Sequence, residues 1–237
     1  MSEVAERLAG VRERIARAAA RAGRDPDEVA LVGVSKRKPA EAIVAAVAAG
    51  LGNVGENYVQ EAVAKLPDVR AAVDAQGLAL PRFHFVGQLQ RNKARDVVAH
   101  FDCVESVDRA SLARALDAKA EAADRRLSVL LQVDLSDEPG KGGASPEALP
   151  DLLAACAALS HLSVDGLMAV PAPGRDAEAS RPAFSRLREL RDRLREAPGG
   201  GSLRELSMGM SGDFEVAIEE GATLVRVGTA IFGPREN

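Results

Sequence analysis

One lysine stands at the end of a long apolar run, where the chain leaves the interior of the fold. Lys36 follows residues 29–35, and the β-branched content of that run is typical of a strand buried on both faces of a parallel sheet. α/β folds keep their chemistry at the carboxyl ends of such strands. A lysine in this position shifts its pKa readily and suits a Schiff-base amine. The alternative is that the ammonium of Lys36 only extends from the strand end into water.

The C-terminal part of the chain has the features of a phosphate site. Gly228 and Thr229 follow the strand-like residues 223–227 and offer backbone N–H groups and a hydroxyl, which is how proteins bind phosphate. Ser207, at the end of the preceding strand, is placed to reach the same anion. Arg226 lies within an apolar run, where a guanidinium needs an acceptor, and a ligand could supply one. A lysine for an aldehyde, a phosphate cradle and a strand arginine together predict a pyridoxal phosphate (PLP) site.

The rest of the sequence alternates between strand-like and helix-like segments. We expect eight strands, near residues 29–35, 52–55, 83–86, 101–106, 127–134, 163–169, 203–207 and 223–227. Helical patterns separate them, and a first helix over residues 2–22 precedes them. This alternation predicts the α/β class, with a parallel sheet closed into a (β/α)8 TIM barrel and an extra N-terminal helix. The 237 residues fit one such barrel, so we expect a single domain over residues 1–237.

Five segments, in the same order along the chain, resemble the pyridoxal phosphate homeostasis proteins, which are single-domain relatives of the N-terminal barrel of alanine racemase. These segments are residues 34–36, 55–61, 84–93, 206–211 and 225–233. The resemblance extends over residues 29–233, nearly the whole chain. It implies a barrel that holds PLP as an aldimine of Lys36, with Asn57 in the cofactor region. It also implies a role in intracellular PLP homeostasis or carriage, with no established reaction.

An amino-acid racemase-like PLP enzyme is the alternative interpretation. Alanine racemases carry a second, β-rich domain whose tyrosine acts as a base. This chain stops four residues after Gly233, and Tyr58 is its only tyrosine. If Arg226 faces the pyridine nitrogen, it also keeps the ring a poor electron sink. We therefore expect no catalytic residue and at most a weak PLP-dependent side activity.

Composition narrows the classes of protein and partner. The net charge is −4, from 31 basic and 35 acidic residues, and no basic stripe interleaved with aromatics is present, which argues against nucleic-acid binding. We see no signal peptide or membrane-spanning run, and Cys103 and Cys156 lie in apolar surroundings, so we expect a cytoplasmic protein with reduced thiols. The three histidines share no metal-ligand spacing, so no metal site is predicted. We expect a monomer whose partners are PLP and, transiently, apo forms of PLP enzymes.

Three positions keep more than one interpretation. His84 is either a structural strand histidine or a ligand contact, and Lys38 stays open as a ligand contact. The glycine-rich residues 140–143 favour a loop over the barrel mouth, with Lys141 as a secondary anion contact. A nucleotide-binding loop is disfavoured because such a loop needs serine or threonine after the lysine, and here Gly142 follows.

Two residues depart from the family pattern. Phe83 stands where tryptophan is usual, which we expect to affect packing more than chemistry. Glu105 stands where many members have histidine. With Ser106 and Asp108, it is typical of turn and N-cap chemistry before the next helix.

Overall fold

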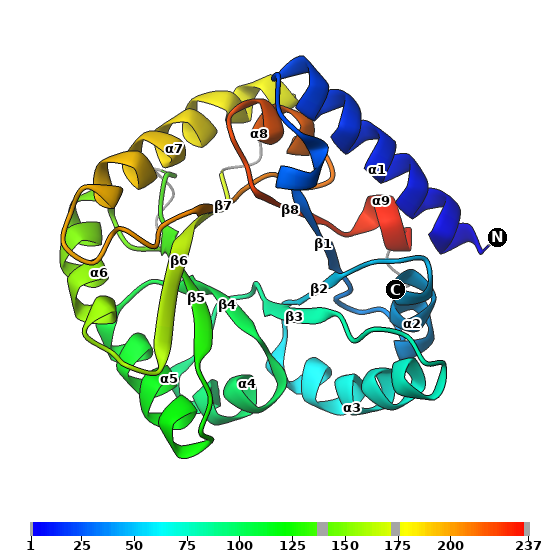
Figure 1. Cartoon of the computed structure of the whole chain (residues 1–237), viewed down its shortest axis with the longest axis horizontal. Coiled ribbons are helices and arrows are strands. Elements are labelled where there is room, and N and C mark those ends of the chain that lie inside the picture. Colours follow the sequence, from blue (N-terminus) through cyan, green and yellow to red (C-terminus); the bar gives the residue numbers. More distant parts are fainter. Residues whose placement is uncertain (1, 137–141, 172–175, 235–237) are drawn as a thin grey trace.

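Eight parallel strands form a closed barrel in chain order, and the last strand pairs with the first (Figure 1). The computed structural model describes residues 2–136, 142–171 and 176–234. The strands are β1 (Ala30–Val34), β2 (Asn53–Glu56), β3 (Arg82–Phe85), β4 (Cys103–Val107), β5 (Leu127–Val133), β6 (Leu162–Ala169), β7 (Glu205–Ser207) and β8 (Leu224–Val227). The (β/α)8 barrel expected from the sequence is confirmed, and every strand end lies within two residues of its predicted position.

Helices surround the barrel on its outside (Figure 1). They are α1 (Glu3–Arg21), α2 (Ala40–Ala48), α3 (Val59–Ala75), α4 (Ala94–His100), α5 (Ala110–Ala122), α6 (Leu149–Ala157), α7 (Arg181–Arg195), α8 (Phe214–Glu219) and α9 (Thr229–Phe232). Four short 3-10 helices are η1 (Pro26–Glu28), η2 (Arg91–Lys93), η3 (Pro146–Ala148) and η4 (Ala177–Ser180). The short helix α9 directly follows β8, and Gly228 is its N-cap residue.

The extra N-terminal helix forms where the sequence predicts it. Ser2 caps α1 by accepting a hydrogen bond from the N–H of Ala5 at 3.3 Å. Leu8, Val11 and Ile15 repeat at helical spacing and are buried. Figure 1 shows that this helix runs along the outside of the barrel beside α8 and α9, which its apolar stripe covers.

Strand register decides which side chains meet inside the barrel. β3 pairs with β4 so that His84 lies opposite Cys103, and Glu105 follows two residues later on the same face of the strand. Ser207 lies opposite Leu224, which places Arg226 two residues further along β8. His84, Glu105, Ser207 and Arg226 are all buried. Polar groups in such a position must find partners within the barrel.

The remaining expectations concern the loop with Lys141 and membrane-spanning segments. Lys141 lies outside the described residues, so its anion contact stays a prediction. None of the helices in the described ranges is long and apolar enough to cross a membrane.

Candidate functional site

A cavity of about 330 Å³ opens at the carboxyl ends of the strands. Its lining comes from the ends of β1, β2, β3, β6 and β8 and from the loop after β7, and consists of Val34, Lys36, Asn57, Val86, Val170, Met210, Ser211, Gly212, Arg226, Gly228 and Thr229. Five of the six predicted site residues are therefore together in one cavity. The sixth, Ser207, is not among the lining residues. The cavity combines an amine, a guanidinium and two hydroxyls with apolar walls.

Arg226 needs an acceptor, as expected, and the protein itself supplies two. Its guanidinium donates to the hydroxyl of Ser207 and, at 2.8 Å, to the carbonyl of Ala169. The carboxylate of Glu105 lies 3.9 Å away. Burial lowers the pKa of Arg226, and Glu105 opposes that shift. The guanidinium of Arg226 nevertheless remains charged. The cavity therefore contains a fixed positive charge, which the carboxylate of Glu105 balances.

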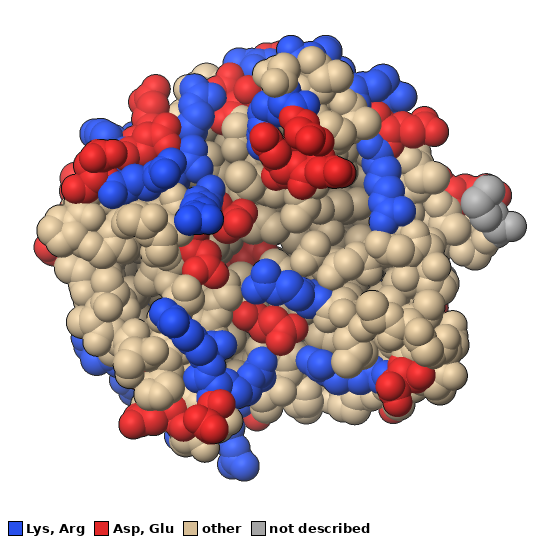
Figure 2. Space-filling view, viewed as in Figure 1, with Lys and Arg blue, Asp and Glu red and all other residues tan. Residues whose placement is uncertain are grey.

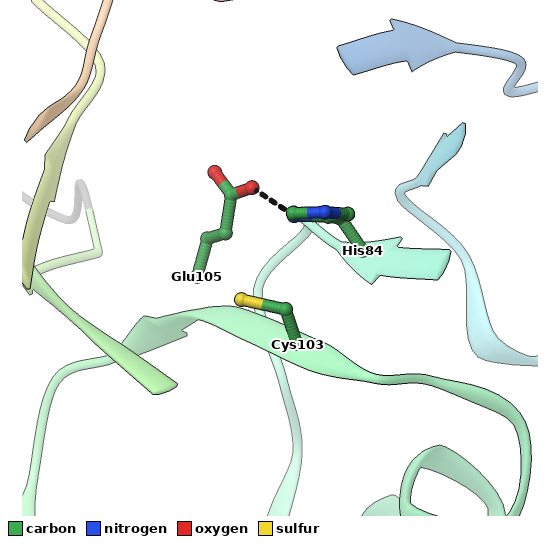
Figure 3. Close-up of side chains that lie close together, drawn as sticks. All are labelled: His84, Cys103 and Glu105. Atoms are coloured by element: carbon green, nitrogen blue, oxygen red, sulfur yellow. Dashed lines mark hydrogen bonds and ion pairs between the residues drawn. The ribbon is translucent and has the colours of Figure 1, made fainter. Parts of the chain in front are cut away.

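Glu105 lies in the barrel interior and not in a turn. The predicted turn and N-cap role does not hold, because Glu105 lies within β4 and is fully buried. Its carboxylate accepts hydrogen bonds from Nδ1 of His84 at 2.7 Å and from the hydroxyl of Ser207 at 2.5 Å. Figure 3 shows His84 and Glu105 pointing toward each other across adjacent strands. The signal in the sequence was the position of Glu105, two residues after a buried cysteine in an apolar run.

The charge state of Glu105 follows from these contacts. Burial raises the pKa of its carboxyl, but the hydrogen bond from His84 and the charges of His84 and Arg226 outweigh burial and lower the pKa below its ordinary value. The ionised carboxylate can only accept hydrogen bonds. Nδ1 of His84 therefore carries a proton and donates a hydrogen bond to Glu105. Nε2 of His84 faces Asn53, 3.3 Å from Oδ1. His84 therefore acts as a buried donor to Glu105.

Ser207, which was predicted to reach the phosphate, and Ser211 lie in different surroundings. Ser207 is fully buried, and its hydroxyl connects Arg226 to Glu105. Ser211 lines the cavity, and its hydroxyl accepts a hydrogen bond from the N–H of Gly228 at 3.3 Å. The phosphate contact of Ser207 stays a prediction, and Ser211 is a further candidate because it lines the cavity. The sequence signal for Ser211 was present, since residues 206–211 belong to a segment of the family resemblance.

Asn57 lines the cavity and has an unsatisfied acceptor. Its Oδ1 is buried and has no hydrogen-bond partner among the described residues. The backbone of Gly87 packs against Asn57 so closely that a Cβ at Gly87 would lie 2.1 Å from the Asn57 carbonyl oxygen. Only glycine fits there, and the close approach holds Asn57 at the cavity wall. A buried amide oxygen without a partner is costly unless a ligand or water supplies a donor.

The lysines near the mouth differ in their surroundings. Lys36 follows β1 and lines the cavity. Lys38 does not line it, and its ammonium donates to the carbonyl of Pro234 at 2.6 Å. Of these two lysines, only Lys36 lines the cavity.

His84, Cys103 and Glu105 bring their donor atoms within 4.8 Å of one another, as a metal site would (Figure 3). Arg226 argues against a metal, because its guanidinium already neutralises Glu105 and would repel a second cation. Burial and the charge of Glu105 also raise the pKa of the Cys103 thiol, whereas a metal binds the thiolate. His84 and Glu105 form part of the ion-pair network of the barrel interior, and Cys103 lies beside them as a buried thiol.

A second cavity, of about 410 Å³, lies at the opposite, amino ends of the strands. His84 and Cys103 line it together with Arg82, Arg204, Asp165 and Glu205. Figure 2 shows basic and acidic side chains gathered around the hollow centre of the molecule. His84 therefore faces the amino-end cavity, and it is not among the lining residues of the cavity that contains Lys36.

Comparisons with known proteins agree with this architecture. The family profile described as "Alanine racemase, N-terminal domain" matches residues 7–236. The pyridoxal phosphate homeostasis protein of Pseudomonas aeruginosa is 48% identical over 237 residues, covering 100% of this chain and 97% of the relative. The Escherichia coli K12 protein of the same name is 42% identical over 240 residues, covering 100% of this chain and 98% of the relative. A solved structure of PipY from Synechococcus elongatus, described with PLP bound, has a TM-score of 0.83 and 39% identity, covering 98% of this chain and 100% of PipY.

Proposed function

This chain belongs to the family of pyridoxal phosphate homeostasis proteins, built on the alanine racemase N-terminal barrel, and from this premise we propose that it binds PLP at the carboxyl ends of its strands and buffers the cofactor in the cytoplasm. The observation that carries the proposal is the presence of Lys36, Arg226 and the Gly228–Thr229 turn in one cavity. PLP binding by a relative that covers nearly the whole chain supports it.

The polar residues of the cavity match the parts of the cofactor. The N–H of Thr229 and the hydroxyls of Thr229 and Ser211 would bind the phosphate, while the Gly228 N–H, which donates to Ser211, would orient that hydroxyl. Arg226 would donate to the pyridine nitrogen, and Asn57 would accept a hydrogen bond through its unsatisfied Oδ1. Ser207 would act on the cofactor only through Arg226.

Lys36 is the residue that would hold the aldehyde. Its neutral amine would condense with the aldehyde of bound PLP, and the aldehyde oxygen would leave as water. The proton of the ammonium must first leave to solvent, and because the cavity opens at the strand ends, solvent can reach it. The bond is reversible, since water or another amine can attack the same carbon. A reversible covalent bond beside a separate phosphate site suits a buffer of a reactive aldehyde.

The cavity supports carriage over catalysis. Apart from Arg226, whose guanidinium stays protonated, Lys36 is the only titratable side chain among the described lining residues. Tyr58, the only tyrosine, is not part of the lining, and its ring lies 5.9 Å from the guanidinium of Arg37. Racemisation needs an acid and a base on opposite faces of the substrate carbon, and this cavity offers one such group.

Cofactor exchange tests the buffering role. Holo-protein is incubated with an apo form of a PLP enzyme, first across a dialysis membrane and then in one compartment. Recovery of enzyme activity in both arrangements shows release into solution, and recovery only on direct mixing shows a transient complex; either outcome supports carriage. No recovery in either arrangement would mean that the cofactor is locked in and that the proposed buffering is wrong.

A further inference from the structure

The turn that carries Lys36 has an unfavourable backbone conformation, which needs contacts from other segments of the chain to hold it. The N–H of Lys38 donates to the carbonyl of Ser35 at 3.0 Å, which closes a four-residue turn with Lys36 and Arg37 in its centre. Arg37 has a φ of 59°, in the left-handed region that residues with a side chain seldom adopt. Such a backbone persists only where its surroundings determine it.

Lys65 of α3 ties the two ends of this turn together. Its ammonium donates to the carbonyl of Ser35 at 2.9 Å and to the carbonyl of Lys38 at 3.0 Å. One side chain thus bonds the residues on both sides of Lys36 and Arg37. The Lys65 side chain is only 11% exposed, so water competes little for these bonds.

Two carboxylates fix Lys65 and the turn to each other. Glu61, four residues before Lys65 on α3, accepts from its ammonium at 2.6 Å and from the N–H of Arg37 at 2.5 Å. Glu56, at the end of β2, lies 2.8 Å from the same ammonium and accepts a hydrogen bond from the hydroxyl of Ser35. Glu56 is fully buried, which a carboxylate tolerates only with such partners. The cluster of Glu56, Glu61 and Lys65 therefore spans β2, α3 and the turn.

We propose that Lys65, held by Glu56 and Glu61, is a positioning residue that presents Lys36 to the cofactor aldehyde. The inference rests on the proposed PLP site and adds residues that contact no ligand. Covalent attachment requires the amine within reach of the aldehyde, and a shift of about 1 Å in a reacting group can cost about 100-fold in rate. Without the hydrogen bonds from Lys65 and to Glu61, the turn with its left-handed Arg37 would change conformation. Lys36 would then move away from the aldehyde. Glu56 and Glu61 both belong to the segment 55–61, of which only Asn57 lines the cavity.

The experiment separates attachment of the aldehyde from binding of the rest of the cofactor. Lys65→Met is compared with wild type and with Lys119→Met, which changes an exposed lysine on α5. The probes are PLP, whose attachment is followed by visible absorbance, and pyridoxine 5′-phosphate, which has no aldehyde. We expect Lys65→Met to slow attachment about 10- to 100-fold while its affinity for pyridoxine 5′-phosphate stays within about twofold. Lys119→Met should match wild type, and Lys65→Arg, whose guanidinium can donate to the same acceptors, should recover part of the rate.

Several results would overturn the inference. Attachment to folded Lys65→Met at the wild-type rate would show that the turn needs no anchor. Equal losses for both probes would show that Lys65 supports the whole cavity and not the position of Lys36. Should Lys65→Met fail to fold, Glu61→Ala removes the acceptor of the Arg37 N–H while favouring the helix, and unchanged attachment there contradicts the inference equally. Wild-type protein that binds PLP without attaching it would instead refute the proposed role of Lys36.

Discussion

The guanidinium of Arg226 and the carboxylate of Glu105 lie 3.9 Å apart inside the barrel, and Ser207 connects them by hydrogen bonds on both sides. Arg226 also lines the cavity at the strand ends, whereas Glu105 does not. The positive charge of Arg226 at the cavity is thus balanced by Glu105 on β4, which lies outside the lining. His84 completes the arrangement as a donor to Glu105.

Removing the charge of Glu105 should weaken the fold. Glu105→Gln keeps the shape of the side chain but leaves the buried guanidinium of Arg226 without its counter-ion. We expect the free energy of unfolding to fall by about 1.5–3 kcal/mol, the range for hydrogen bonds that involve a charged group. Urea unfolding measures this change, and Glu189→Gln on the exposed face of α7 is the control, expected to be neutral. A loss equal to that of the control would mean that the pair contributes nothing.

The pH dependence of stability should move in opposite directions for the two buried carboxylates. The pKa of Glu105 lies below its ordinary value of 4.5, so its contribution is complete above about pH 4.5 and is lost as the pH falls through the lower folded pKa. Burial raises the pKa of Glu56 above 4.5 despite the opposing charge of Lys65, so its contribution is complete below about pH 4.5 and is lost as the pH rises through the raised folded pKa.

Unfolding of two variants over about pH 3.5 to 7 tests these directions. The deficit of Glu105→Gln relative to wild type should shrink toward acid. Glu56→Gln, in contrast, should gain stability relative to wild type as the pH rises. Parallel profiles for the two variants would contradict the assigned shifts.

Loss of hydroxyls at the phosphate end should affect only phosphorylated ligands. We expect Ser211→Ala and Thr229→Val each to weaken PLP binding about 10- to 100-fold, corresponding to a hydrogen bond to a charged group of about 1.5–3 kcal/mol. Binding of pyridoxal, which lacks the phosphate, should not change. Equilibrium titration of both ligands makes the comparison within each variant. Equal losses for PLP and pyridoxal would place the phosphate elsewhere.

Catalysis of amino-acid reactions should be negligible. The cavity has one candidate base, and Arg226 would keep the pyridine nitrogen unprotonated, which weakens the ring as an electron sink. Incubation of holo-protein with L-alanine, followed by chiral analysis, measures racemisation directly. Turnover of about 1 per second or faster, an ordinary enzymatic rate, would contradict the carrier interpretation.

The cavity could be predicted from the sequence because parallel strands bring their carboxyl ends together. Lys36 and Asn57 directly follow β1 and β2, and Gly228 and Thr229 follow β8, so the barrel fold alone places them at one mouth. Arg226 was recognisable as a cation that needs an acceptor. These inferences need only the order of strands and the position of each residue along its strand.

The partners inside the barrel could not be predicted in the same way. Glu105 and Ser207 are 102 residues apart and meet through strand register and barrel shape, which no local pattern encodes. The contacts of Lys65 with the turn after β1 likewise join α3 to a segment about 30 residues earlier. A turn motif was therefore assigned to Glu105 from its neighbours in sequence, although its neighbours in space determine its role.

Borohydride reduction of the PLP complex, followed by peptide mass mapping, tests the central claim most directly. Reduction fixes a C=N bond as a stable amine at the lysine that formed it. We predict one modified peptide, with the cofactor on Lys36, and no modification in Lys36→Ala, which should still bind PLP weakly through its phosphate. Lys38→Ala should be labelled at Lys36 like wild type. Labelling of Lys36→Ala at wild-type stoichiometry, or a wild-type label on Lys38 or Lys141, would contradict the assignment of Lys36 as the residue that holds the cofactor.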